Sequence, residues 1–414
     1  VRNAFTAGID FTRYFKNRLY YIDVKGMFSS LNGSKEAIAV RQTSPVHYYQ
    51  RASASGYLGV DPDRRSLNGT GGYVKVGRKG NAKWAFSETF SWSSPGFDLN
   101  DMGYMKEADN RTNETEVVYR QTDIWKLFRY NAFTLTQKNQ WNYGGTPFSN
   151  DVALRWQSMT MSRYEMDMKE TFVWNRLDSR LLRGGWDMRL NPYFQTSVKV
   201  NTDKAKRMMF MLKYEGNHNL DGYNRFNTLS PSLTFRLGNH VYLSGQVDYA
   251  WNTDDMQYVG TLKSSAASSD RHNSSPVYLM GHMDQKTYGV TMRLQVNVTP
   301  DISIQFYGSP FTSTAKFSDF KEAADTKSST YDKRFHVFSG DELSFADGTY
   351  HIKREGREAS FKNPDFSFNE FRSNLVARWE YLPGSTLYFV WEHRMSNQES
   401  RRIGGWGNNL DRMF

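Results

Sequence analysis

The side chains best suited to metal binding or nucleophilic chemistry are few in this chain. It contains 8 histidines and no cysteine among 414 residues, so thiolate ligands, cysteine nucleophiles and disulfides are excluded together. No histidine falls in an HExxH motif or a paired ligand spacing, and we therefore predict no metal site and no cofactor. His47, His218, His272, His282 and His351 lie in polar segments, where a lone histidine is expected to be solvated.

The stretch SPGFDLND offers a second set of possible ligands, Asp98, Asn100 and Asp101. Their oxygens could hold calcium. The spaced D-x-D-x-D-G pattern is absent, however, so a turn built by Pro95 and Gly96 is the favoured interpretation. A hydrolase at the rim of the fold would need Asp, His and Ser to converge in space, and the sequence singles out no such set. We predict no catalytic residues and no enzyme activity.

Polar side chains instead recur at every second position of many segments, which is the spacing of one face of a β-strand. We predict that this face lines a lumen. Its charges have mixed signs, which favours either a wide aqueous channel or a lumen crossed by salt bridges and occupied by loops. The candidate lumen-facing residues are Asp10, Asp23, Lys25, Arg155, Lys169, Lys213, Asp248, Arg293, Arg378 and Glu392.

The opposite face of these segments is apolar, and KTYGVTMRLQVNVTP at residues 286–300 is the clearest case. The positions between its apolar residues carry Thr, Gly, Arg, Gln and Asn. We predict that the apolar row contacts lipid. The candidate lipid-facing residues are Tyr288, Val290, Met292, Leu294, Val296 and Val298.

The connections between the alternating segments are short and long in turn, with tight links such as KNR at 16–18 and PGS at 383–385. Tight turns at one rim and long loops at the other are typical of outer-membrane barrels. We predict an all-β fold, a transmembrane antiparallel outer-membrane β-barrel, with about sixteen strands of roughly 9–11 residues each. Residues 1–414 form a single domain in this interpretation. The long outer loops are expected near 34–70, 94–114, 254–276 and 312–363, with a short helix at SDFKEAADTK in the last of them.

Composition agrees with this fold class. The hydrophobic content is 38% and no apolar run approaches the roughly 20 residues of a spanning helix, so a helical membrane protein is excluded. Aromatic residues make up 15% of the chain, and those at strand ends, such as Tyr14 and Trp379, suit interfacial girdles. A soluble sandwich or propeller is the alternative, but no blade-length repeat is visible.

Charge and the two ends of the chain add further expectations. The net charge of +10 is spread along the sequence without a Lys/Arg-rich run, so we expect outer-membrane lipid and no nucleic acid as a partner. The predicted location is the bacterial outer membrane. If the tight turns are periplasmic, the strand from Thr386 to Asn397 runs outward. We therefore expect further strands before Val1 and one more strand after Phe414.

Four stretches resemble a known family: GSKEAIAVRQTSPVHYYQR (33–51), SPGFDLNDMGYMKEAD (94–109), GSPF (308–311) and FRSNLVARWEYLPGSTLYFVWEHR (371–394). The chain is similar over nearly its whole length to the large barrel family of unknown function, widespread in Bacteroidota, that carries an N-terminal domain similar to carbohydrate-binding family 9. The resemblance implies a signal peptide, that module and more strands ahead of this region. None of the module's binding residues can be assigned to positions here.

Two functions follow as alternatives. The first is solute passage or surface glycan handling, together with the carbohydrate-binding-like module that the resemblance implies. The second is a structural or accessory barrel that docks surface lipoproteins or secretion and assembly machinery in a larger envelope complex. A plugged lumen with an exposed aromatic patch on the loop tips would favour the second function.

Overall fold

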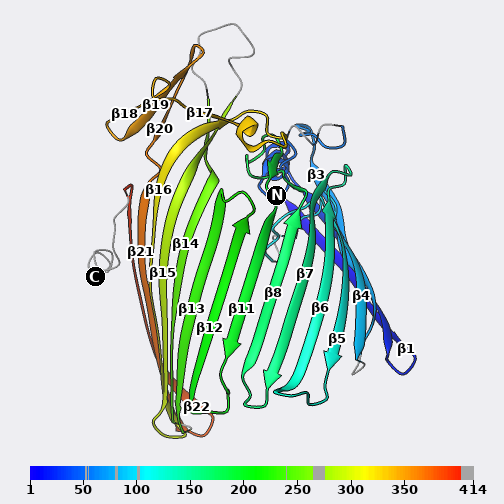
Figure 1. The fold of residues 1–414 in the computed structure, drawn as a ribbon, viewed down its shortest axis with the longest axis vertical. Coiled ribbons are helices and arrows are strands. Elements are labelled where there is room, and N and C mark those ends of the chain that lie inside the picture. The colour runs from blue at the N-terminus through cyan, green and yellow to red at the C-terminus, as the bar shows by residue number, and fades with distance from the viewer. Residues whose placement is uncertain are drawn as a thin grey trace.

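The computed structural model describes residues 1–51, 54, 56–79, 83–99, 103–238, 240–263 and 276–401. Its principal feature is one curved antiparallel sheet, in which each long strand pairs with the next in chain order (Figure 1). The sheet has 17 strands in the described residues, of which β17 is a three-residue addition to β16. The first eight strands are β1 (Asn3–Phe15), β2 (Tyr20–Asn32), β3 (Ser66–Arg78), β4 (Trp84–Ser93), β5 (Asn110–Gln121), β6 (Phe128–Trp141), β7 (Pro147–Thr160) and β8 (Glu165–Trp174).

The second half of the sheet continues the same up-and-down order. Strand β8 pairs with β11, and β16 pairs with β21, because the intervening elements belong to loops. The edge strands of the described sheet are β1 and β22. The remaining long strands are β11 (Tyr193–Asn201), β12 (Met208–Asn219), β13 (Asn224–Leu237), β14 (Val241–Leu262), β15 (Val277–Asn297), β16 (Ile302–Ala323), β21 (Phe366–Leu382) and β22 (Ser385–Glu399).

The predicted all-β antiparallel fold is confirmed: sixteen long strands form one curved sheet, the wall of the predicted barrel. On β1, the apolar side chains of Phe5, Ile9 and Phe11 are 59%, 72% and 53% exposed. A soluble core would bury such a row, whereas lipid accommodates it. No helix among the described residues is long and apolar enough to cross a membrane.

Tight turns join the strands at the lower rim in Figure 1, and the long connections lie at the upper rim. The β1–β2 turn shows what these turns require, since Lys16, Asn17 and Arg18 all have positive φ angles of 45°, 56° and 65°. Asparagine tolerates that conformation better than most residues. Asn239, in the β13–β14 turn, lies outside the described residues.

The upper loops contain their own short elements. Helix α1 (Lys35–Thr43) follows β2 and is capped by Ser34, whose Oγ accepts the backbone N–H of Ala37 at 3.3 Å. The β8–β11 loop holds a two-stranded ribbon, and the β16–β21 loop holds a 3₁₀ turn, β17 and a three-stranded sheet. These elements are β9 (Arg176–Asp178), β10 (Met188–Leu190), η2 (Tyr331–Arg334), β17 (Phe335–Val337), β18 (Leu343–Ala346), β19 (Thr349–Arg354) and β20 (Arg357–Lys362).

Loop boundaries differ from the expected ranges because several strands are longer than expected. Strand β14 extends to Leu262 and β16 to Ala323. The short helix predicted for SDFKEAADTK was therefore wrong: its first six residues, 318–323, are the end of β16, where they pair with β15 and β17. Residues 264–275 of the expected loop 254–276 lie outside the described part of the chain.

Candidate functional site

The strand register assigns every predicted lumen-facing residue to one face of the sheet. Residues directly opposite each other in an antiparallel pair lie on the same face, so rows can be traced from strand to strand. One row runs from Arg293 through Tyr307 and Asn374 to Glu392. Another joins Asp10 to Lys25. The face that carries these residues is called the inner face below.

Most of the predicted charges on the inner face are held in pairs. Lys25 Nζ lies 3.0 Å from Asp10 Oδ2. Arg155 donates through Nε and Nη2 to the two carboxylate oxygens of Asp167, at 2.8 and 2.5 Å. The other predicted residues with a polar or ring contact are Asp23 with Thr12 and Tyr73, Lys213 with Glu215, Asp248 with Ser230 and Gln246, Arg293 with the Tyr307 ring, Arg378 with Glu380, and Glu392 with Asn374. Lys169 is exposed on the same face, opposite Arg155.

The predicted lipid-facing row on β15 lies on the opposite, outer face. Tyr288, Val290 and Leu294 stand opposite Tyr249, Val247 and Leu243 of β14. The side chains of Met292 and Val298 are 43% and 53% exposed. Two carboxylates interrupt the outer face elsewhere: Glu88 accepts from Thr115 at 2.5 Å, and Glu170 accepts from Thr196 at 2.7 Å. A threonine donor on the neighbouring strand thus satisfies part of each carboxylate's hydrogen-bonding capacity.

Upper loops that are distant in sequence meet over the inner face, and we call their assembly the cap. The cap consists of residues 33–51, 56–65, 94–99, 103–109, 175–192 and 324–365. Its centre is the β8–β11 loop, where Arg180 donates to the backbone carbonyls of Pro45 and Lys106, the latter at 2.9 Å. Arg180 also lies 3.2 Å from the carboxylate of Glu107. One guanidinium therefore ties three loops together.

The other side of the β8–β11 loop is fixed to the β16–β21 loop by Arg334, whose side chain is buried. Its Nη1 donates to the carbonyl of Arg189 at 2.8 Å and to Asn191 Oδ1 at 2.6 Å. The backbone N–H of Arg189 donates to Thr326 O at 2.9 Å. Apolar side chains of the same loop, Leu182 and Met188, are fully buried in a cluster with Met256, Met280 and Phe335. The β8–β11 loop is thus anchored at both ends of its span.

A buried polar cluster anchors the 3₁₀ turn to the wall. Lys321 Nζ donates to Asp255 Oδ2 at 2.9 Å, and Tyr331 donates to the same oxygen. His282 Nδ1 lies 3.0 Å from Asp255 Oδ1. Burial, together with the hydrogen bond to the Asp255 carboxylate, raises the pKa of Tyr331, so its hydroxyl remains a donor. The cluster contains a lysine, a carboxylate and a histidine, but each is engaged by the others.

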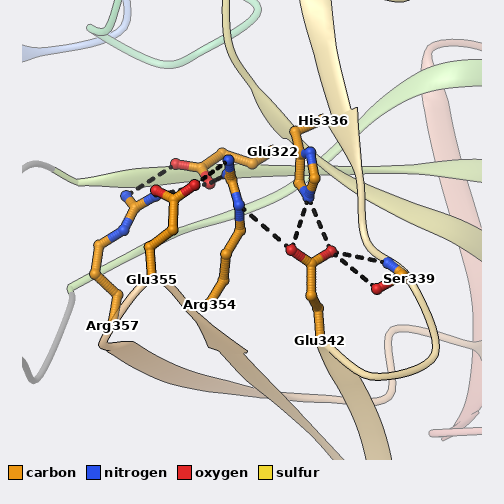
Figure 2. A network of polar contacts seen from close by, with 7 residues as sticks. All are labelled: Glu322, His336, Ser339, Glu342, Arg354, Glu355 and Arg357. Carbon is orange, nitrogen blue, oxygen red and sulfur yellow. Dashed lines mark hydrogen bonds and ion pairs between the residues drawn. The ribbon is translucent and has the colours of Figure 1, made fainter.

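A second network holds the small sheet β18–β20 against β16 (Figure 2). Glu322 accepts from Arg354 at 3.1 Å and from Arg357 at 3.2 Å. Glu342 accepts from the Ser339 backbone N–H at 3.0 Å and lies 2.9 Å from His336 Nε2. These two contacts, the backbone N–H first, lower the pKa of Glu342 below its ordinary value of 4.5.

Beneath the cap, the inner face forms two adjoining polar cavities of about 350 and 180 Å³, which together we call the chamber. Both cavities are lined by Arg176, Leu190 and Tyr193. The Arg176 guanidinium lies 4.5 Å from the centre of the Tyr193 ring and donates to Asn191 O at 3.1 Å. Two buried polar atoms of lining residues, Asp151 Oδ1 and Asn219 Nδ2, have no hydrogen-bond partner among the described residues. The chamber is the part of the molecule best suited to bind a small polar ligand.

The prediction that His47 is solvated was wrong. Its side chain is buried, with Nδ1 2.8 Å from Pro95 O and Nε2 3.3 Å from Asp98 Oδ2. Both acceptors belong to the stretch SPGFDLND, and their contacts with the buried His47 ring join two loops of the cap. The other two predicted calcium ligands, Asn100 and Asp101, lie outside the described residues, and so does His272. The same prediction was wrong for His218 and His282, which are half-buried on β12 and β15: His218 lies 3.1 Å from the Tyr214 hydroxyl, and His282 is held by Asp255. His351 is exposed on β19.

Sequence reasoning missed the residues that build the cap, including Arg180, Arg334 and Lys321. Their partners are mostly backbone carbonyls or residues far away in sequence, so no local spacing identifies them. Within the described residues, no group of three or more His, Asp or Glu side chains could hold a metal ion.

Comparison with known proteins gives a family and a distant fold likeness. The chain is similar to the siderophore receptor PirA from Acinetobacter baumannii, with 10% identity and a TM-score of 0.44 over 94% of this chain. It spans 59% of that receptor's length. A mutant of the ferric enterobactin receptor PfeA from Pseudomonas aeruginosa gives 7% identity and a TM-score of 0.33, covering 96% of this chain and 78% of the receptor. Likenesses this weak carry no functional argument.

No curated protein matches the chain. A family model described as "Domain of unknown function (DUF5916)" matches residues 24–414, which is nearly the whole sequence. The protein therefore belongs to the DUF5916 family.

Proposed function

We propose that the protein resides in the bacterial outer membrane and allows solutes to pass or be held along the inner face. The observation that carries this proposal is the contrast between the two faces of the wall. The apolar outer face suits lipid, and the polar inner face, with charges of both signs, suits water and polar solutes. The chamber beneath the cap is the proposed binding site.

We further propose that the solute is a glycan. The chamber offers amide, carboxylate and guanidinium groups, two of which have a buried atom without a partner, Asp151 and Asn219. A hydroxyl-rich ligand would satisfy such groups, and an unpaired buried polar atom is costly otherwise. The Tyr193 ring and the Arg176 guanidinium, which line both cavities, add flat groups against which a sugar ring can pack.

Conductance in planar bilayers tests this proposal. We expect the full chain to conduct ions and expect oligosaccharides to reduce the current. The Asp151→Ala, Asn219→Ala double variant should keep its conductance but require about thirtyfold more sugar for the same block, since each of the two lost hydrogen bonds is worth about 1 kcal/mol. Asn139→Ala on the outer face is the matched control. No conductance at all, or conductance without block by any sugar, would contradict the proposal.

We propose a structural role rather than catalysis for His47 and His282. The ring nitrogens of His47 face a carbonyl and a carboxylate, and His282 is held by Asp255. His282 Nε2 lies 3.6 Å from Asp284 Oδ1, and no described contact joins either ring to a serine hydroxyl, which a triad would require.

A specific observation favours a second candidate function, the docking of surface lipoproteins or secretion machinery. The cap loops contact one another above the inner face, and two aromatic side chains of the cap, Tyr104 and Trp186, are 92% and 53% exposed. Exposed aromatic residues are typical of the centres of protein interfaces. Purification from native membranes in mild detergent tests this function. A partner should co-purify with the wild type and be lost from Tyr104→Ser, Trp186→Ser, whereas recovery of the barrel alone would count against docking.

A further inference from the structure

The outer face of β13–β16 changes from apolar to basic side chains at one level along the strands. Along β15 the outer positions from Val298 to Tyr288 are apolar, a stretch of the length that crosses a bilayer as a tilted strand. At the top of this stretch, the ring of Tyr288 stacks on Tyr249 at 4.7 Å, and Tyr249 stacks on Trp251 at 5.1 Å. Tyrosine and tryptophan clustered at one level mark the boundary between hydrocarbon and headgroups.

Three cations lie at or directly above this aromatic level on the same face. Lys286 is opposite Trp251, and the next row up contains Arg225 and Lys316, joined across the strands by Thr253 and Asp284. All three side chains are exposed, and none makes an ion pair within the described residues. The one carboxylate among them, Asp284, lies 3.6 Å from His282 Nε2. Arg225, Lys286 and Lys316 therefore form a patch with an excess of positive charge, in contrast to the paired charges of the inner face.

The patch is also hollowed. A groove of about 570 Å³ is lined by Arg225, Trp251, Lys286 and their neighbours, including His218 and Asp284. Its floor is continuous with the apolar row below, because Lys286 and Tyr288 are successive outer positions on one strand. A ligand that fills the groove with an anionic group would therefore place an attached hydrocarbon chain on Tyr288 and Val290.

We propose that this surface, the outer face of β13–β16 at Arg225, Lys286 and Lys316, binds the phosphorylated headgroup of a membrane lipid. Phosphate oxygens accept hydrogen bonds from guanidinium and ammonium groups, and anionic headgroups are attracted to basic residues placed at their depth. The alternation of cation and aromatic ring matches an amphiphile with phosphate above and acyl chain below. This inference rests on the proposed outer-membrane location, and it adds the chemical class of the lipid that occupies one side of the wall.

Lipid retention tests the inference. The full-length protein would be reconstituted in vesicles of phosphatidylcholine alone or of phosphatidylcholine with lipid A, then extracted in detergent, and bound lipid would be counted by native mass spectrometry. The site variant is Arg225→Gln, Lys286→Gln, Lys316→Gln. The control variant, Lys75→Gln, Lys138→Gln, Lys199→Gln, removes the same charge from the inner face.

We expect wild type and control to retain lipid A over phosphatidylcholine, and the site variant to lose at least about tenfold of that preference, since each basic residue near a membrane surface contributes roughly fivefold. Equal retention by all three proteins would overturn the inference, and so would an equal loss in the control, which would mean a net-charge effect. If glycerol phosphate competes as effectively as lipid A, the site binds a soluble phosphate and the assignment to a lipid is overturned. Insertion into phosphatidylcholine vesicles separates the two proposals: failure to insert refutes the membrane location, whereas insertion without preference refutes only the headgroup site.

Discussion

Arginine does most of the long-distance joining at the scale of single residues. Arg180 and Arg334 each donate to backbone carbonyls of other loops, and Arg155 forms a two-point contact with Asp167. The planar guanidinium presents five donors in a fixed geometry, so one side chain can satisfy carbonyls from several directions. Lysine, with its single ammonium group, could not make these contacts. The buried guanidinium of Arg334 is tolerated in the cap because its N–H groups have acceptors.

Removing the Arg334 guanidinium should loosen the cap without disturbing the wall. In Arg334→Ala, the carbonyl of Arg189 and the amide of Asn191 lose their donors, at a cost of about 1.5–3 kcal/mol per contact to a charged group. Hydrogen exchange should accelerate in residues 176–191 and remain unchanged in β12–β14. Lys333→Ala, an exposed neighbour, is the control. Equal protection in both variants would show that Arg334 does not hold the cap.

The Glu342 carboxylate predicts how the β16–β21 loop responds to acid. Its pKa is lowered in the folded protein by the Ser339 N–H and then by His336. A lowered pKa means that the stabilisation is fully present above the ordinary value of about 4.5 and is lost as the pH falls through the lowered folded value. Exchange at residues 335–342, corrected for its intrinsic pH dependence, should rise below about pH 4.5 in the wild type. The rise should disappear in Glu342→Gln and persist in Asp341→Asn; identical profiles in all three proteins would refute the assignment.

At the scale of elements, the sequence predicts the wall better than its upper extensions. Period-two alternation identified the sixteen strands because lipid and water demand opposite side chains at successive positions. Above the membrane both faces meet polar surroundings or other loops, and the alternation no longer separates strand from loop. Residues 312–323 and 254–262 were expected in loops for this reason, although they continue β16 and β14.

Adjacent positions on β15 should respond in opposite ways to the same substitution. Leu294→Arg places a charge on the lipid-facing row and should destabilise the barrel by about 2–4 kcal/mol, the cost near the middle of a bilayer. Gln295→Arg, on the inner face, should change the stability little. Urea unfolding in vesicles, followed by tryptophan fluorescence, measures both. A similar loss in the two variants would contradict the assignment of the faces.

At the scale of the whole molecule, the candidate site is a property of tertiary arrangement rather than of any motif. The inner-face residues follow from alternation and could be named from the sequence. The chamber could not, because Arg176, Asp151 and Asn219 come from different strands and a loop that folds back over them. His47 shows the same limit, since its partners Pro95 and Asp98 lie in another loop.

The long reach of the cap contacts has a consequence for the order of assembly. Arg180 and Pro45 are 135 residues apart, and Arg334 and Arg189 are 145 residues apart. Bringing such distant segments together is entropically costly in an unfolded chain but inexpensive once the intervening strands have zipped into place. We therefore expect the cap to form last during biogenesis. Protease resistance of residues 175–192 should appear only after the strands of the wall have paired.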